Sequence, residues 1–195
     1  MKAAKQSRCP WCETNELLKT YHDNEWGVPV TDDQKLFEFM VLDAFQAGLS
    51  WLTILKKREA FRDAFDNFNP EKIVSYSDKK IEKLMNDEKI IRNKLKIEST
   101  VSNAKAYLEM CEKGGSFSDF IWQFTKHKTI TNKWKLQSEI PASTVESDVM
   151  SKALKKAGFR FVGSTICYAF MQAAGLVNDH ITSCYRYQEI KKLAR

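Results

Sequence analysis

The chain has 195 residues, with 31 lysines and arginines against 25 acidic residues and a net charge of +6. Its hydrophobic fraction of 43% is enough for a core, and only 7 glycines and 4 prolines argue against a disordered or linker-rich array. No apolar stretch approaches the roughly 20 residues of a membrane span, so we expect a soluble cytoplasmic protein without a membrane partner. We also expect a monomer. The excess of basic charge favours a nucleic-acid partner.

Helical periodicity dominates the chain from residue 31 to residue 124. The spacing of apolar residues and the turn signals predict helices over 31–48, 50–69, from 70 onward, 77–85, 93–112 and 116–124. Thr31-Asp32-Asp33-Gln34 has the form of a capping box at the start of the first helix. Gly114 and Gly115 end the longest helix.

The last third of the chain contains an irregular connection followed by a helical hairpin. Residues 125–145 have no clean period, whereas helices are predicted over 148–157 and 164–174, joined by a loop over 158–163. No long β-rich run appears, so the predicted fold class is all-α. We expect a single domain over 1–195. Its helical lobe, at about 31–145, carries the hairpin 148–175, and its terminal segments 1–30 and 176–195 are joined.

Two pairs of potential metal ligands stand near opposite ends of the chain. Twelve residues separate Cys9 from His22, and three separate His180 from Cys184. Two thiolates and two imidazoles make a closed tetrahedral zinc site, which holds a fold together instead of performing chemistry. The residues alone leave Cys12 as an alternative to Cys9. A redox role for the pair Cys9 and Cys12 is a further alternative, although the βαβ context of such pairs is missing.

The loop of the predicted hairpin combines glycines with basic residues. Gly158 can adopt the left-handed conformation that ends one helix, and Gly163 precedes the next helix, whose first backbone N–H groups can bind a phosphate. The residues predicted to contact a DNA backbone are Lys155, Lys156, Gly158, Arg160, Gly163, Ser164 and Thr165. The alternative is an ordinary hairpin on a basic surface.

Aromatic residues gather in the first quarter of the chain. They are Trp11, Tyr21, Trp26 and Trp51. Aromatic faces recognise bases outside a duplex, although such residues at helical spacing more often form core. A metal at Cys9 and His22 would fix three of them around one spot. Asp43 and Gln46 share a face of an apolar helix, where a carboxylate costs free energy unless it is paired or used. The alternative for this pair is a solvated helix face.

Four long segments carry a recognisable pattern. They are Tyr21 to Pro29, Gln46 to Trp51, Ile54 to Glu59 and Gly158 to His180. Together they resemble the bacterial 3-methyladenine DNA glycosylase I family, and the likeness runs from Cys9 to about Cys184. The resemblance implies a helix-hairpin-helix glycosylase fold with a structural zinc that joins the N- and C-terminal segments. The implied zinc ligands are Cys9, His22, His180 and Cys184, so the resemblance favours Cys9 over Cys12.

The resemblance also implies a base-binding pocket. The residues expected to bind the base are Trp11, Tyr21, Trp26, Gln46 and Trp51, and the expected catalytic residue is Asp43. The family places a glutamate at the position of Asp43, so the carboxylate that contacts the base edge is one methylene shorter here. Leu18 stands where well-known members carry a tyrosine, and Phe45 stands where small or polar residues are common. These three departures leave the identity of the base open.

The implied activity is hydrolysis of the N-glycosidic bond of 3-methyladenine in alkylated double-stranded DNA, after the methylated purine has been flipped out of the duplex. Methylation at N3 gives the base a positive charge and makes it a good leaving group, so little acid catalysis is needed. The motif positions no lysine as a Schiff-base nucleophile, so we expect a monofunctional enzyme without lyase activity. Two alternatives stay open: a glycosylase retuned to a different alkylated base, and a non-catalytic DNA-binding protein on the same scaffold.

Overall fold

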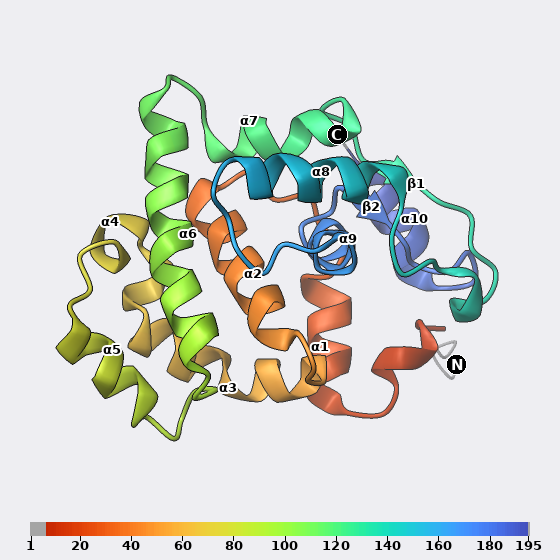
Figure 1. The fold of residues 1–195 in the computed structure, drawn as a ribbon. Coiled ribbons are helices and arrows are strands. Elements are labelled where there is room, and N and C mark those ends of the chain that lie inside the picture. Colours follow the sequence, from red (N-terminus) through yellow and green to blue (C-terminus); the bar gives the residue numbers. More distant parts are fainter. Residues whose placement is uncertain (1–6, 195) are drawn as a thin grey trace.

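The computed structural model describes residues 7–194, and nearly all of its regular structure is helical (Figure 1). The α-helices are α1 (Glu16–Asn24), α2 (Asp33–Gln46), α3 (Trp51–Ala64), α4 (Pro70–Ile73), α5 (Asp78–Met85), α6 (Lys94–Glu112), α7 (Phe117–Trp122), α8 (Val145–Lys156), α9 (Ser164–Ala173) and α10 (Tyr185–Leu193). Short 3-10 helices lie at Pro10–Cys12, Asp66–Phe68, Gln123–Thr125 and Gln137–Glu139. The all-α class is confirmed. The single domain over 1–195 stays a prediction, since residues 1–6 and 195 lie outside the described residues.

Two helices begin elsewhere than predicted because a neighbouring residue is the better cap. The carboxylate of Asp32 accepts a hydrogen bond from the backbone N–H of Lys35 at 2.7 Å, so α2 is capped by Asp32 and not by Thr31. Helix α8 begins three residues earlier than predicted, because Thr144 and Ser147 form a reciprocal capping box. Helix α1 was not predicted at all.

The connection predicted to be irregular, residues 125–145, contains a short strand. Strand β1 (Ile130–Thr131) pairs in parallel with β2 (Val177–Asn178), the segment that follows α9 (Figure 1). The backbone N–H of Thr182 extends this contact by donating to the carbonyl of Trp134 at 2.8 Å. The connection is therefore anchored on the C-terminal segment.

No helix among residues 7–194 has the length and apolar character needed to cross a membrane.

Helix α2 occupies the middle of the core. It runs between α3, α6 and α9 (Figure 1), and α7 also contacts it. Every residue from Leu36 to Phe45 is buried, including the acidic residues Glu38 and Asp43. Because neighbouring helices cover this stretch of α2, the side chains of Glu38 and Asp43 face protein. Asp43 is only 2% exposed, which excludes a solvated helix face for this residue.

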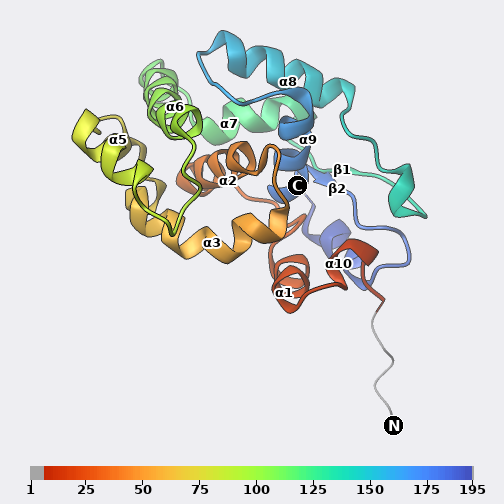
Figure 2. The same ribbon diagram turned by 60° about the horizontal axis from the view of Figure 1, so that its bottom comes forward.

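A smaller apolar cluster joins the two ends of the described chain. Its buried members are Cys9, Cys12, Leu18, Tyr21, Trp26, Leu55, Ile181 and Cys184. Figure 2 shows α1 and α10 side by side. The ring of His22 in α1 lies 6.3 Å from that of Tyr185 in α10. The terminal segments thus meet in space, as predicted.

Candidate functional site

Four predicted metal ligands from opposite ends of the chain meet in one buried group. Cys9, His22, His180 and Cys184, here called the metal clasp, have all their ligand atoms within 4.8 Å of one another. Nδ1 of His180 lies 3.2 Å from Nε2 of His22 and 3.6 Å from Sγ of Cys184. All four residues are buried. The group is compatible with a four-coordinate metal site.

Both imidazoles of the metal clasp are held by their outer nitrogens. Nδ1 of His22 bonds to the carboxylate of Asp23 at 2.8 Å, and Nε2 of His180 bonds to the carbonyl of Trp26 at 3.0 Å. Each ring therefore turns its other nitrogen inward, as metal-ligating histidines do. Arg8 donates to Asp23 through contacts of 2.9–3.0 Å. Burial opposes ionisation of Asp23, but hydrogen bonds from Arg8 and His22 outweigh it and lower its pKa.

The sulfur atoms distinguish Cys9 from Cys12. A hydrogen bond with Cys9 lowers the pKa of the Cys184 thiol and raises that of the Cys9 thiol. A metal cation between them would favour the thiolate at both positions. Cys12 lies outside the clasp, and its buried Sγ donates to the carbonyl of Cys9 at 3.1 Å. The structure therefore selects Cys9 over Cys12 as a member of the group.

A cavity of about 370 Å³, within the range of small-molecule sites, lies beside the metal clasp. Its lining residues are Trp11, Tyr21, Trp26, Asp43, Gln46, Trp51, Gln137, Ile140, Pro141, Ala142, Thr165, Tyr168, Ala169, Gln172 and Ala173. All five residues predicted to bind a base, and the predicted catalytic residue Asp43, belong to this wall. Sequence reasoning missed the residues from the irregular connection and most of those from α9, because nothing in their local pattern shows that they fold over the cavity.

Contacts between rings tie the cavity to the metal clasp. Trp26 stacks on His22 with ring centroids 6.1 Å apart and meets Trp11 edge-on at 5.1 Å. Tyr21 lies 5.3 Å from Trp51. Because His22 belongs to the clasp, the clasp fixes one aromatic wall of the cavity, as the sequence predicted.

Two buried polar atoms on the cavity wall, Asp43 Oδ2 and Trp51 Nε1, have no hydrogen-bond partner among residues 7–194. Leaving a buried polar group unpaired costs about 1–3 kcal/mol. Burial raises the pKa of Asp43 well above its ordinary value. Burial, and then the nearby Asp43 charge, also raise the pKa of Tyr21, which therefore stays a neutral phenol. Unpaired atoms in a cavity of this kind indicate a place where a ligand supplies the missing partners.

The hairpin between α8 and α9 has the backbone conformation predicted for it. Gly158 has a φ of +95°, in the left-handed region, and ends α8. Gly163 caps α9 without a side-chain hydrogen bond, so the first N–H groups of α9 have no side-chain cap. Thr165, in the first turn, is exposed and also lines the cavity. The predicted phosphate site and the cavity are therefore contiguous.

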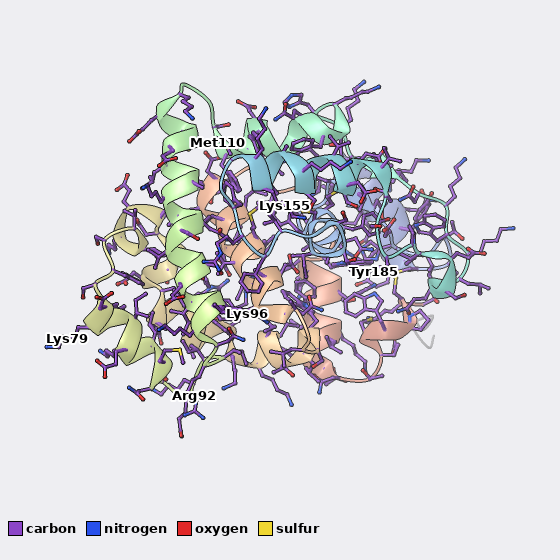
Figure 3. All side chains as sticks on the ribbon, viewed as in Figure 1. Lys79, Arg92, Lys96, Met110, Lys155 and Tyr185 are labelled. Carbon is purple, nitrogen blue, oxygen red and sulfur yellow. The ribbon has the colours of Figure 1, made fainter. Side chains whose placement is uncertain are left out.

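Buried polar side chains hold this hairpin from inside. Asn103 of α6 donates to the carbonyl of Arg160 at 3.1 Å and accepts from its N–H at 2.7 Å. Ser151 donates to the carbonyl of Val162 at 2.6 Å. The predicted basic residues remain exposed on the outside, and Figure 3 shows one of them, Lys155, on α8. Sequence reasoning missed Asn103 and Ser151, whose only signal was a polar residue within a helical pattern.

The profile of the methyladenine glycosylase family matches residues 11–187. The chain belongs to this family. A DNA-3-methyladenine glycosylase 1 from Escherichia coli (strain K12) is 52% identical over 180 residues, which are 92% of this chain and 96% of the relative. A solved structure of 3-methyladenine DNA glycosylase I has a TM-score of 0.90 at 50% identity, covering 92% of this chain and 98% of that chain. A variant of 3-methyladenine DNA glycosylase I in complex with 3-methyladenine has a TM-score of 0.88 at 35% identity, covering 91% and 96%.

The expected departures from this family's pattern do not all reach the cavity. Asp43 lines it, but Leu18 and Phe45 are not among its lining residues. Leu18 packs in the terminal cluster. Phe45 is fully buried in the main core, where its ring lies 4.7 Å from that of Phe61. Of the three departures, only Asp43 can therefore contact a bound base directly.

A lysine that the sequence did not single out supports the end of α2. Lys96 of α6 is 6% exposed, and its Nζ donates to the carbonyls of Phe45 at 2.8 Å and Ala47 at 2.6 Å. Burial lowers the pKa of Lys96. Figure 3 shows Lys96 near the middle of the view and Lys79 and Arg92 at its rim. The ammonium group satisfies carbonyls at the C-terminus of α2, whose last turn forms part of the cavity wall.

Proposed function

We propose that this protein hydrolyses the N-glycosidic bond of 3-methyladenine in alkylated double-stranded DNA. It is a DNA glycosylase by family, and relatives that are 52% and 50% identical carry the name DNA-3-methyladenine glycosylase. The observation that carries the proposal is the cavity, where all six residues predicted to bind or excise a base form one wall.

The cavity suits a purine that carries a positive charge. Aromatic faces attract cations, and Tyr21 and Trp51 offer two such faces. The unpaired oxygen of Asp43 accepts a hydrogen bond from the amino group at the base edge. A positive charge beside Asp43 favours its carboxylate form, which burial otherwise disfavours. Unmethylated adenine brings no charge and leaves the carboxyl group neutral, so it is held less strongly.

The reaction then needs little proton transfer. The protein binds the duplex, the damaged nucleotide rotates into the cavity, and the aromatic wall holds the base. Bond cleavage returns the base electron pair to a cationic ring, which leaves as neutral 3-methyladenine, and water attacks the sugar carbon. Selective binding of the base therefore supplies most of the catalysis. Among the described lining residues, Asp43 is the single carboxylate, as this reaction requires.

In this proposal, backbone N–H groups at the start of α9 bind a phosphate next to the lesion. The uncapped N–H groups after Gly163 are the donors, and Ser164 lies in the same turn. Exposed basic residues of the hairpin add sequence-independent attraction to the DNA backbone. They are Lys155, Lys156 and Arg160.

The enzyme is monofunctional in this proposal and leaves an abasic site without nicking the strand. Among the described residues, no lysine lines the cavity, so no amine stands ready to form a Schiff base with the sugar. Treatment of the protein and methylated DNA with borohydride is expected to trap no covalent complex. A trapped complex would contradict this part of the proposal.

The metal clasp binds a structural zinc ion in this proposal. Zn–N bonds of about 2.05 Å and Zn–S bonds of about 2.3 Å set tetrahedral ligand separations of about 3.3 Å for N···N and about 3.6 Å for N···S. The corresponding separations here are 3.2 Å for the two nitrogens and 3.4–3.7 Å for three N···S pairs. The four ligands leave no open position, so zinc joins the terminal segments without taking part in the chemistry.

Identification of the bases released from methylated DNA tests the proposed activity. Chromatography is expected to show 3-methyladenine. Release of a different alkylated base would support a retuned glycosylase, an alternative suggested by the shorter Asp43. DNA binding without release of any base would support a non-catalytic binder. The monomeric state and the cytoplasmic location stay predictions, and size-exclusion chromatography tests the first.

A further inference from the structure

Asp179 is 1% exposed and accepts hydrogen bonds from four neutral side chains. Oδ1 accepts from Asn132 Nδ2 at 2.7 Å and from Trp134 Nε1 at 2.8 Å. Oδ2 accepts from the hydroxyl of Tyr168 at 2.6 Å and from Gln172 Nε2 at 2.8 Å. The four hydrogen bonds stabilise this buried side chain. A side chain that only filled space in the core would not need them.

The two oxygens of Asp179 serve different parts of the molecule. The donors to Oδ2, Tyr168 and Gln172, lie on α9 and line the cavity. The donors to Oδ1 lie on the connection, a few residues before the stretch that lines the cavity at 140–142. Asp179 itself is not among the lining residues and stands directly before His180 of the metal clasp. It therefore supports the cavity wall from behind.

Both oxygens of Asp179 accept two hydrogen bonds each, so this side chain decides which way its four donors point. The hydroxyl proton of Tyr168 is directed at Asp179, which leaves the phenol oxygen only as an acceptor for any ligand. Gln172 directs one N–H of its amide group at Asp179, which fixes the orientation of the amide and leaves its carbonyl oxygen for other partners. Burial and then the bond to Asp179 raise the pKa of Tyr168, so the phenol keeps its proton.

We propose that Asp179 is a positioning residue for base excision, which holds Tyr168 and Gln172 as hydrogen-bond acceptors toward the base. This inference rests on the proposed function. A cationic adenine presents amino N–H donors and a positive charge, which acceptor atoms attract and donor atoms repel. Asp179 thereby selects for the damaged base through residues that touch it, without touching it itself.

Asp179→Asn tests the proposal because an amide has one acceptor and one donor end. The indole N–H of Trp134 can only donate, so the amide oxygen must face Trp134 and the amide NH2 must face Tyr168 and Gln172. Tyr168 then accepts with its phenol oxygen and Gln172 with its amide oxygen, so both residues present hydrogen-bond donors to the cavity. Single-turnover excision of 3-methyladenine is expected to slow by at least roughly tenfold, with unchanged half-saturation for DNA and unchanged zinc content.

A second substitution separates positioning from a merely structural role. Trp134→Phe removes the donor that forces the amide orientation, while Asn132 can flip its own amide. The double variant Asp179→Asn/Trp134→Phe should therefore regain part of the lost excision rate, although it loses one more native hydrogen bond. A structural role predicts the opposite, a further loss. A double variant no faster than Asp179→Asn, or an Asp179→Asn enzyme at the wild-type rate, would overturn the proposal.

Asp33→Asn is the matched control. Asp33 is a carboxylate that accepts from the backbone N–H groups of Phe117 and Ser118, away from the cavity, so its loss should lower thermal stability without slowing excision. If Asp179→Asn yields no folded protein, Tyr168→Phe provides the test. It removes one acceptor and leaves the Asp179 side chain in place, and an unchanged rate would contradict the proposal.

Binding of free 3-methyladenine, followed by tryptophan fluorescence, distinguishes this inference from the proposed function. If the wild-type protein releases no base from DNA, the proposed activity fails. The free base is neutral but keeps its amino N–H donors, so its affinity still reports on the acceptors of the cavity wall. This affinity is expected to fall by roughly tenfold in Asp179→Asn and to recover partly in the double variant. Equal affinities in all three proteins would contradict the role of Asp179.

Discussion

The metal clasp and the cavity lie side by side and both contain buried polar atoms, but they differ in how those atoms are paired. In the clasp, the outer nitrogens of His22 and His180 are bonded to Asp23 and to the Trp26 carbonyl, and the inner ligand atoms face one another. On the cavity wall, polar atoms of Asp43 and Trp51 have no partner in the described chain. In the proposed function, the first site holds its metal permanently and the second binds a ligand that comes and goes.

This difference predicts two separate kinds of mutational effect. Damage to the clasp should lower the free energy of unfolding, because the clasp joins segments that are distant in sequence. Damage to the cavity should slow excision with little loss of stability, because unpaired polar groups contribute nothing favourable to the folded state. A substitution at one site that lowered both the free energy of unfolding and the excision rate would contradict this distinction.

The largest effect is expected for Cys184→Ser. Loss of one thiolate from a closed four-ligand site should release the metal and lower the free energy of unfolding by more than about 4 kcal/mol. The melting temperature should fall by about 10 °C, and elemental analysis should find less zinc. Cys12→Ser is the control, since Cys12 is equally buried but lies outside the clasp. Equal zinc content in both variants would remove Cys184 from the ligand set.

The next effect is expected for Asp43→Asn. The amide cannot supply the charge that the cationic base requires, so single-turnover release of 3-methyladenine should fall by about 100-fold. Zinc content should not change, and the melting temperature should hold or rise, because an unpaired buried carboxyl group is lost. Excision at the wild-type rate would show that the carboxylate has no part in the reaction.

A pH series sharpens the assignment of Asp43. Burial raises the pKa of folded Asp43 above 3.8, the ordinary value that applies to the unfolded chain. Above about pH 4 the unfolded chain therefore holds fewer protons at this position than the folded protein, so the contribution of Asp43 to stability decreases as pH rises. The stability of Asp43→Asn relative to wild type should increase over the same range in urea unfolding. In parallel, kcat/KM should rise with pH in the wild type and stay flatter in the variant.

The smallest effect on the fold is expected for Gly163→Ala. Gly163 has a φ of −66°, and a Cβ there would meet no atom within 4 Å, so the melting temperature should stay within about 1–2 °C of wild type. A methyl group beside the uncapped N–H groups of α9 should nevertheless hinder a phosphate and weaken DNA binding. Gly115→Ala is the control, because its Cβ also meets nothing within 4 Å. Equal DNA affinity in both variants would place the phosphate elsewhere.

The sequence by itself predicted which residues meet at the two sites. The ligands of the clasp stand in motifs of unusual composition, and the resemblance to the glycosylase family tied Asp43 and the aromatic residues to one pocket. The structure then brought them together as expected. Residue type alone left alternatives open, because thiols and indoles also occur in ordinary cores, and the resemblance to the family selected among them.

Only the tertiary structure decided which polar residues support those sites. Lys96, Asn103 and Asp179 look ordinary in sequence, yet each is buried and bonded to a segment far away in the chain. The direction of Phe45, away from the cavity and into the core, also depends on the helices packed around α2. A hydrogen-bond partner or a packing direction is a property of two segments at once, and no pattern within one segment can specify it.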